Sequence, residues 1–385
     1  MKGPVEIMNL DALHRAYEGF FGAPDYVLSL SLGEEGGPLE RLDVVYDFPK
    51  PAEGKLDTTI TTLGLALHPM EAPCERAELS IAILGRHSRE DNDRLGRALA
   101  QLVRECLRSR RTFAPNLILE GHSLPFFEGM EQLFVLDWGH TEPEWLGDVD
   151  PPVRLLEVVP VYAGEAAELA EVDETVRTTL LVQARGAWSD PGRDPVPLLE
   201  RAVGSAWERL ERWYRERAPA VHADLRPGAS GEEVAALQGR LGMRLPDDLV
   251  ASLKRHNGAV IFHDGYRYLS AGAIVELWSM MQSLKQQGAF STYEPKASVK
   301  GVLQHTWWDA GWIPFAEDGQ GNLICVDLNP GPDGKRGQVI YWERVEGPLT
   351  SRYGSLFEWL WRYQHALYRG AYVYVAEDGA LRAKI

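Results

Sequence analysis

The sequence predicts a protein of mixed α and β structure that folds as two domains. Its 385 residues are too many for one ordinary hydrophobic core. Apolar residues make up 45% and charged residues 25%, which is the composition of a globular protein. The clearest break is WSDPGRDPVP (188–197), where three prolines and a glycine fall within ten residues. We therefore expect domains over 1–190 and 222–385, joined over 191–221 by a proline-rich linker and an amphipathic connector helix.

The first domain shows strand and helix patterns in turn. LDTTITTLGLALHP (56–69) is rich in β-branched residues and predicts a strand that enters a turn at Gly64. RAELSIAIL (76–84) alternates and then becomes apolar, which is typical of a buried strand. Apolar residues recur at helical spacing over 91–111, and the basic last turn suits the negative end of the helix dipole. Further strands are expected over 131–138 and 153–162, followed by a helix at GEAAELAEV (164–172).

A long amphipathic helix follows the break. Apolar residues recur at helical spacing from Leu199 to Tyr214, with arginine and glutamate between them, and this pattern predicts a helix over 198–217. Pro219 lies just beyond its end. We expect the tryptophans of this helix to pack on a neighbouring domain.

The second domain begins with two short helices. Ser230 and Glu233 form the capping-box pattern that opens the first. PDDLVASLKRHNG (246–258) has acids in its first turn and bases in its last, and Asn257-Gly258 favours a left-handed exit. The rest predicts, in order, a strand at GYRYLS (265–270), a helix capped by Ser270, a meander of WIPFA (312–316), LICVDL (323–328) and QVIYWER (338–344), a helix over 354–368 and a hairpin over 371–385.

The net charge of −16 belongs entirely to the first half of the chain. Residues 1–196 hold 18 basic and 34 acidic residues, whereas residues 197–385 hold 22 of each. Such a field repels nucleic-acid phosphates and favours a basic partner. Simple solubility is the alternative explanation.

The acids are densest from Asp137 to Glu174, where eleven acids face one base, Arg154. HTEPEWLGDVDPP (140–152) has a loop-like composition, and functional residues are often placed on such loops. We predict a protein-binding surface there, with the alternative of a solvated loop whose tryptophan enters the core. The predicted partner-binding residues are Glu142, Glu144, Trp145, Asp148 and Asp150.

The sequence shows no catalytic or metal-binding constellation. The acidic turn 317–322 lacks the ligand order of a calcium loop, and Gly331–Gly337 lacks the Gly-Lys-Ser/Thr sequence and the helix of a phosphate loop. The ten histidines form no paired metal ligands, and at the end of its helix His256 favours capping over catalysis. No cofactor is expected, and we expect a protein that is not an enzyme.

Cysteine use and hydropathy indicate the compartment. Cys74, Cys106 and Cys325 are scattered and odd in number, which favours free thiols in a reducing cytoplasm. No signal peptide and no apolar run of about 18 residues is visible, so we expect a cytoplasmic protein without a membrane partner.

Residues 224–365 resemble the SUKH superfamily, which includes the yeast cell-wall-assembly regulator. The resemblance rests on LRPGASGEEVAALQGRLGMRLPDDLVASLKRHNG, YLSAGAIVELWSMM and TWWDAGWIPFAEDGQGNLICVDLNPG, followed by GQVIYWE. Residues 38–190 resemble the bacterial suppressor of fused domain through DTTITTLGLALHP, AELSIAILG, GHSLPF and LLEVVPVYAGEAAEL. The signature residues, expected to be structural, are Asn257, Gly258, Trp307, Trp308, Trp312, Pro314, Phe315, Gly319 and Asp327.

The resemblance implies an α+β fold for each domain, a mostly antiparallel mixed sheet covered by helices. It also implies a protein that binds proteins, because bacterial members of both families are frequently immunity proteins that bind and block a cognate toxin. Many such toxins are basic nucleases, which an acidic first domain would suit. No binding residues are carried over, because the toxin-facing surfaces vary between members.

Two alternatives remain beside the immunity protein. The yeast relative favours a regulatory scaffold with several partners. An unrecognised hydrolase would use the acids around Asp148 and Asp150.

Overall fold

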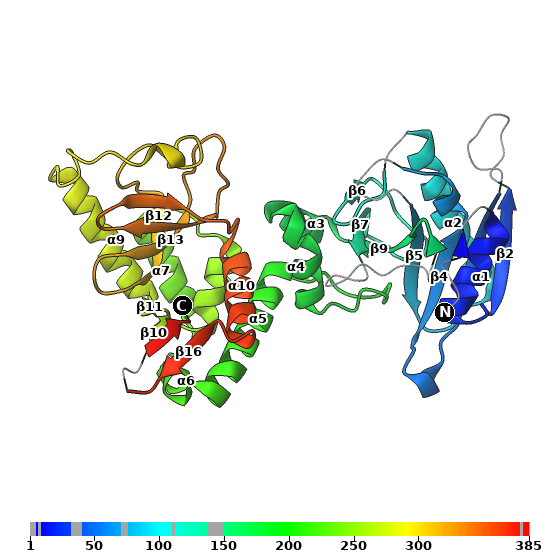
Figure 1. The fold of residues 1–385 in the computed structure, drawn as a ribbon, viewed down its shortest axis with the longest axis horizontal. Helices are drawn as coiled ribbons and strands as arrows, with labels where there is room; N and C mark the ends of the chain where they lie inside the picture. Colours follow the sequence, from blue (N-terminus) through cyan, green and yellow to red (C-terminus); the bar gives the residue numbers. More distant parts are fainter. Residues whose placement is uncertain are drawn as a thin grey trace. The chain divides into compact units, whose positions relative to one another are not determined.

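The computed structural model describes residues 5–6, 9–31, 41–70, 76–109, 112–137, 149–377 and 380–384. The chain forms two compact units, Met1–Val182 with Gly186–Val196 and Gln183–Arg185 with Pro197–Ile385 (Figure 1). In this division residues 197–221 are part of the second unit. The reason is burial, because Trp207 and Tyr214 of this helix are fully buried and Trp213 is 8% exposed.

The first unit is built on a mixed sheet. Within the described residues it has seven strands in the order β2-β3-β4-β5-β9-β7-β6, antiparallel except for the parallel pair of β5 and β9. The bounds are β2 Tyr26–Ser31, β3 Arg41–Asp47, β4 Asp57–Leu63, β5 Ala77–Leu84, β6 Ile118–Glu120, β7 Gln132–Asp137 and β9 Arg154–Val161. A short parallel pair joins β1 (Val5–Glu6) to β8 (Val149–Asp150).

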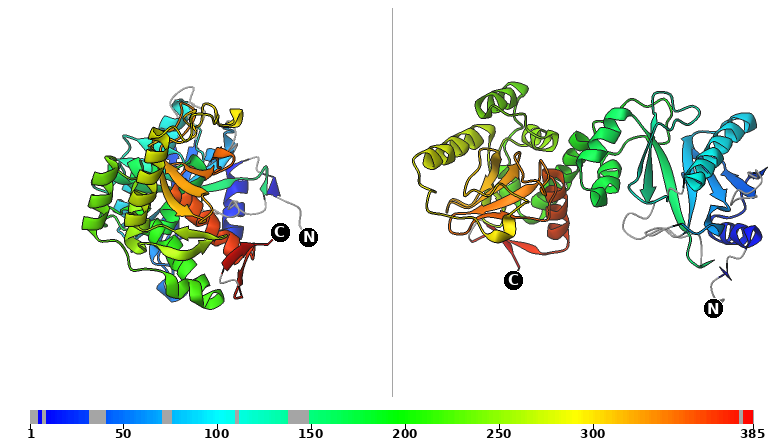
Figure 2. Two further views of the ribbon diagram at one scale, coloured as in Figure 1. Left: turned by 90° about the vertical axis from the view of Figure 1, so that its left-hand side faces the viewer. Right: turned by 90° about the horizontal axis from the view of Figure 1, so that it is seen from above.

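Helices lie on opposite faces of this sheet. On β3, Val44 packs into the cluster under α2 (Arg89–Arg108), whereas Val45 packs into the cluster under α1 (Leu10–Phe21). Neighbouring residues of a strand point to opposite faces, so the two helices cover different sides of the sheet (Figure 2). Helices α3 (Ala163–Glu171) and α4 (Arg177–Ala184) follow β9.

A buried ion pair ties the proline-rich segment to the first unit. The Arg193 guanidinium donates to the two carboxylate oxygens of Glu165 at 2.5 and 2.8 Å, and both side chains are at most 3% exposed. Arg193 also donates to the Pro160 carbonyl, and Glu165 accepts from the backbone N–H of Val196. Burial of both charges is tolerable because each has several partners.

The second unit is built on an antiparallel sheet. In the part of the chain that the structure describes, its six strands have the order β10-β11-β12-β13-β14-β15. The bounds are β10 Ala259–His263, β11 Tyr266–Tyr268, β12 Trp312–Glu317, β13 Leu323–Asp327, β14 Val339–Glu343 and β15 Gly347–Thr350, and a separate hairpin consists of β16 Tyr372–Val375 and β17 Ala380–Ala383. The helices are α5 Leu198–Arg217, α6 Pro219–Asp224, α7 Gly231–Leu241, α8 Asp247–Arg255, α9 Ala271–Gln286 and α10 Leu356–Tyr368.

Helices cover both faces of this sheet as well. Met281 of α9 packs with Leu323 and Cys325 of β13 on one face. On the other face, Phe315 of β12 meets the Trp359 ring of α10 at 5.6 Å between centroids. Figure 1 shows α9 on one side of the sheet and α5 and α10 on the other. The predicted α+β class is confirmed in both units. None of the helices in the described ranges is long and apolar enough to cross a membrane.

His263 lies among aromatic rings at the edge of this sheet. Its ring centroid is 4.9 Å from that of Trp359, 4.7 Å from Tyr363 and 5.3 Å from Tyr372. Burial lowers the pKa of His263 to about 4, and the nearby Asp264 charge opposes this shift only in part. The neutral imidazole is therefore the form that the folded unit accommodates.

Replacing Glu165 by Gln should lower the free energy of unfolding of the first unit by about 3 kcal/mol, because Arg193 then stays buried without a countercharge. The matched control is E105Q, since Glu105 is half exposed and its contact with His122 spans 3.6 Å, and this variant should lose less than about 1 kcal/mol. Urea unfolding measures both. Equal losses in the two variants would contradict the structural role of the buried pair.

Acid should destabilise the second unit through His263. Because its folded pKa of about 4 lies below the usual value near 6.5, the unfolded chain binds the proton more readily, so the contribution of His263 to stability falls as pH drops from about 6.5 to 4. Asp248 and Asp327, whose pKa values are raised by burial, contribute with the opposite sign in the same range, so the His263 component is read from the difference between variants. The expected loss is on the order of 3 kcal/mol. H263F should remove this component of the pH dependence, whereas H305F, the same change at an exposed histidine, should leave it in place. Unfolding curves at several pH values give the free energy of unfolding as a function of pH. If this free energy depends on pH as steeply in H263F as in the parent protein, the assignment is wrong.

Candidate functional site

The signature tryptophans lie in the core of the second unit. Trp308 and Trp312 are fully buried and Trp307 is 6% exposed. The Trp308 ring meets Trp312 at 5.8 Å and Trp342 at 5.9 Å, both edge to face, and the Trp342 Nε1–H donates to the Trp307 carbonyl. These rings pack between α9 and the sheet, in one buried cluster with Met281 and Cys325.

The remaining signature residues shape turns and strand ends. Pro314 and Phe315 belong to β12, and Gly319 has a φ of +72° in the β12–β13 turn. The Asp318 carboxylate accepts from the backbone N–H groups of Gln320 and Asn322, so the acidic turn is closed by its own backbone. Burial raises the pKa of Asp327 to about 6, although hydrogen bonds from Gln338 and from the backbone of Asn329 oppose this shift.

Asn257 and Gly258 connect α8 to α9 and the sheet. The Asn257 amide oxygen accepts from the backbone N–H of Ala271 at 2.8 Å, at the start of α9. Gly258 has a φ of +101°, and a Cβ there would lie 3.1 Å from Ser270 N and 3.2 Å from Tyr268 O. The helix itself ends earlier than the expected exit, since His256 is the C-cap.

Most of the predicted acidic surface falls outside the described residues. Glu142, Glu144, Trp145 and Asp148 are in this group. Asp150 ends β8 and is exposed. Farther along the acidic stretch, Glu171, Asp173 and Glu174 are exposed, but Glu165 is buried against Arg193 and contributes no surface charge.

Two other buried carboxylates bind backbone. Glu78 accepts from Gly64 N at 2.7 Å, from Ala66 N at 3.0 Å and from the Thr62 hydroxyl, and burial raises its pKa to about 7 despite these bonds. Asp248 accepts from the backbone N–H of Phe357 at 2.9 Å, at the start of α10, and burial raises its pKa to about 6. Among the residues described, no three of His, Cys, Asp and Glu gather as they would around a metal ion.

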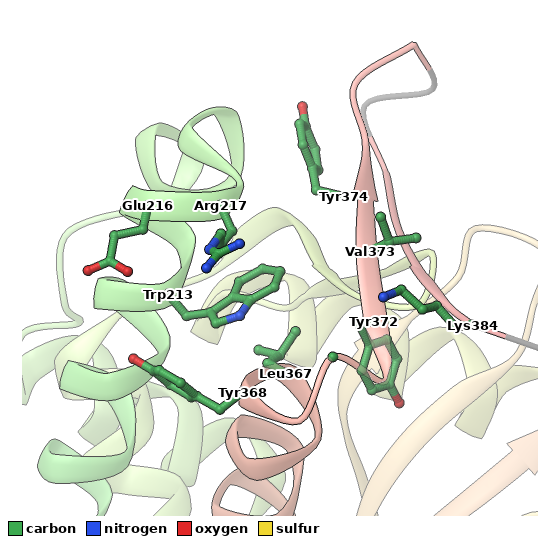
Figure 3. A pocket seen from close by; sticks show the side chains of 10 residues that line it. Trp213, Glu216, Arg217, Leu367, Tyr368, Tyr372, Val373, Tyr374 and Lys384 are labelled. Carbon is green, nitrogen blue, oxygen red and sulfur yellow. The ribbon is translucent and has the colours of Figure 1, made fainter.

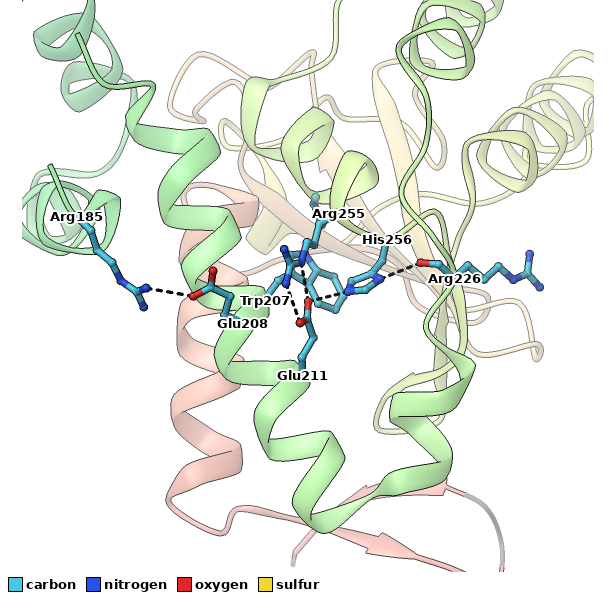
Figure 4. Close-up of polar contacts among 8 residues, drawn as sticks. Arg185, Trp207, Glu208, Glu211, Arg226, Arg255 and His256 are labelled. Carbon is cyan, nitrogen blue, oxygen red and sulfur yellow. Dashed lines mark hydrogen bonds and ion pairs between the residues drawn. The ribbon is translucent and has the colours of Figure 1, made fainter. Parts of the chain in front are cut away.

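Glu211 on α5 binds the end of α8. Its carboxylate accepts from the Arg255 guanidinium at 2.6 and 2.7 Å and lies 2.9 Å from His256 Nε2 (Figure 4). Burial alone would raise the pKa of Glu211, but the bonds from His256 and Arg255 outweigh it and lower the pKa to about 2. His256 Nδ1 faces the Arg226 carbonyl at 2.9 Å, so His256 links three segments, which is consistent with the predicted capping role.

A groove lies between the ends of α5 and α10 and the β16–β17 hairpin. Its volume is about 370 Å³ (Figure 3). Its walls combine aromatic and aliphatic side chains with charged ones, and the side chains that line it belong to Trp213, Glu216, Arg217, Leu367, Tyr368, Tyr372, Val373, Tyr374 and Lys384. Tyr368 is 45% and Val373 41% exposed, which is high for side chains of this size. Such a surface can hold an apolar side chain and a charged group at the same time.

The first unit has a larger cavity of about 570 Å³ on the sheet face beside α1. Thr59, Thr61 and Ser80 form part of its floor, and Asp47 and Lys55 bring opposite charges to its wall. The Tyr17 hydroxyl donates to Asp47, and burial raises the pKa of both groups. Apolar side chains, among them Phe21, Leu84 and Leu155, share the lining of this cavity with these polar groups.

Neither cavity was predicted from the sequence. The available signal for the groove was YVYV (372–375), a strand with large side chains on both faces close to an aromatic helix end. Such a strand is either buried on both sides or available for binding.

Residues 228–362 match the SMI1 / KNR4 family (SUKH-1). This confirms the resemblance found in the second domain. The match leaves out every residue that lines the groove, because those residues lie on α5 and beyond residue 362.

Three of the relatives are fungal proteins that are named as regulators. The cell wall biosynthesis/cell cycle regulator smi1 of Schizosaccharomyces pombe is 28% identical over 198 residues, which cover 47% of this chain and 39% of the relative. The glucan synthesis regulatory protein of Neurospora crassa is 26% identical over 182 residues, covering 37% and 34%. The cell wall assembly regulator SMI1 of Saccharomyces cerevisiae is 22% identical over 178 residues, covering 36% and 35%. The chain thus spans well under half the length of these relatives.

Suppressor-of-fused structures match the N-terminal half. A putative SUFU homolog from Neisseria gonorrhoeae covers 48% of this chain and 95% of its own, with 13% identity and a TM-score of 0.37. Drosophila Suppressor of Fused covers 62% of this chain and 64% of its own, with 13% identity and a TM-score of 0.37. At this similarity the structures say nothing about what this chain binds.

Gly258→Ala should destabilise the second unit by about 2–3 kcal/mol, because the left-handed backbone and the close contacts to Ser270 and Tyr268 act together. The matched control is G242A, where φ is +68° and a Cβ would meet nothing within 4 Å, with an expected loss of about 1 kcal/mol. Thermal and urea unfolding give both values, and a smaller loss for G258A than for G242A would contradict the packing argument.

Proposed function

We propose that this chain is a protein-binding protein without catalytic activity. The observation that carries the proposal is the contrast between its buried carboxylates and its exposed aromatic groove. Glu78, Glu165 and Asp248 are engaged with backbone or with a buried guanidinium and do not face a substrate site. The exposed aromatic groove, by contrast, has the composition of a protein interface. The family relatives, which are named as regulators, support the same role.

The more specific proposal is an immunity protein that binds and neutralises a basic bacterial toxin domain such as a nuclease. Its support is electrostatic. The first 196 residues carry the whole net charge of −16, and Glu120, Glu128 and Glu131 are exposed near the paired strands β6 and β7. A field of this sign accelerates encounter with a basic protein, and the affinity would then come from a buried apolar contact that covers the active site of the toxin.

The second candidate is a regulatory scaffold with several partners, acting in cell-wall growth or signalling. The names of the fungal relatives favour it. The two candidates differ in stoichiometry, because an immunity protein forms one tight complex, whereas a scaffold forms several weaker ones.

Co-expression with candidate toxins from the same genome tests the immunity proposal. One toxin should be neutralised, with growth restored and a complex of defined stoichiometry recovered. E120K/E128K/E131K should slow association about tenfold at low salt, and the difference should vanish near 0.5 M NaCl as the charges are screened. If the chain protects cells from none of the toxins but captures several partner proteins, the scaffold is favoured. The absence of any protein partner would contradict both candidates.

A further inference from the structure

The groove between α5, α10 and the β16–β17 hairpin has the features of a peptide site. We propose that it binds an extended acidic segment of a partner protein, with an aromatic or aliphatic side chain on the groove floor and a carboxylate between Arg217 and Lys384. This proposal rests on the proposed protein-binding function and specifies one site for it. The site lies in the segments that flank the residues matched by the family.

The groove floor is apolar and fixed in place. Trp213 is 8% and Leu367 1% exposed, so only part of the indole faces the opening. The Tyr372 ring packs 5.3 Å from His263 and 5.5 Å from Tyr363. The Tyr368 hydroxyl donates to the Arg209 carbonyl at 3.2 Å. A floor whose rings are already ordered loses little conformational entropy when a ligand binds.

The charged groups at the rim favour an anion. Arg217 and Lys384 project toward the space between α5 and the hairpin (Figure 3), and the lining contains one acidic side chain, Glu216, beside these two basic ones. Neither of the two cationic side chains has an ion-pair partner among the described residues. Two unpaired cations beside an apolar floor complement a peptide that alternates acidic and apolar residues.

The strand edge explains why the ligand is extended. Tyr372, Val373 and Tyr374 all line the groove, although consecutive side chains of a strand point to opposite faces. The groove therefore follows the edge of β16 and not one of its faces. Within the described residues β16 pairs with β17, and no strand is paired with its other edge. An added peptide strand would receive backbone hydrogen bonds there and place alternate side chains on the floor and at the rim.

The test uses the full chain and three fluorescein-labelled decapeptides. One alternates aspartate with phenylalanine, the second has lysine for aspartate, and the third has serine for phenylalanine. Fluorescence anisotropy should show binding of the first peptide at least about tenfold tighter than that of the other two, a difference of about 1.4 kcal/mol. R217E/K384E should lose this preference and gain affinity for the lysine peptide. The matched control R215E, the same change at an exposed residue of α5 that does not line the groove, should bind as the parent protein does.

Equal binding of all three peptides, or no binding below millimolar concentration, would overturn the proposal. A monomer–dimer equilibrium in sedimentation that R217E/K384E abolishes would also overturn it, because a second copy of the chain would then cover the groove. Failure of this site can be distinguished from failure of the proposed function. A partner that binds R217E/K384E with parental affinity refutes this site alone, whereas the absence of any partner refutes the function and leaves the peptide result standing.

Discussion

Hydroxyl groups from two helices meet at the carbonyl oxygen of Phe262 on β10, and the second unit depends on this contact. Tyr363 of α10 donates to that oxygen at 2.6 Å, and the Tyr214 hydroxyl of α5 lies 3.2 Å from both the oxygen and Tyr363. A buried carbonyl at a sheet edge requires such donors. The three groups are almost fully buried, so the contact sets the position of α5 and α10 against the sheet. The next residue, His263, extends the same contact region to the hairpin through Tyr372.

The groove follows from this arrangement. Helix α5 precedes the family match, and the end of α10 and the hairpin follow it, yet all converge on β10. Trp207 donates to the Ser252 hydroxyl of α8, and Glu211 binds Arg255, so α5 is attached to the matched domain along its length.

Much of the local structure was predictable because it depends on neighbouring residues. The helix over 198–217 and the Ser230–Glu233 capping box are confirmed with the expected bounds and bonds. The meander is confirmed as β12, β13 and β14. The structure adds elements that were not predicted, among them α1, β2, β3, β10 and β15. Short strands such as β10 carry too few residues for a clear period, and Val260 and Ile261 keep part of their surface exposed even though the strand is paired.

By itself the sequence determined the α+β character, the signature of the second domain and the division of charge, since these depend on residue type, spacing and motif. The tertiary structure alone decided that α5 belongs to the second unit and that residues near 213–217 and 367–384 share one groove. That juxtaposition joins positions about 150 residues apart, and burial of Trp207, Tyr214 and Tyr363 against β10 produces it. The spacing of residues in the sequence does not predict such a contact, because its energy comes from surfaces that meet only after the chain has folded.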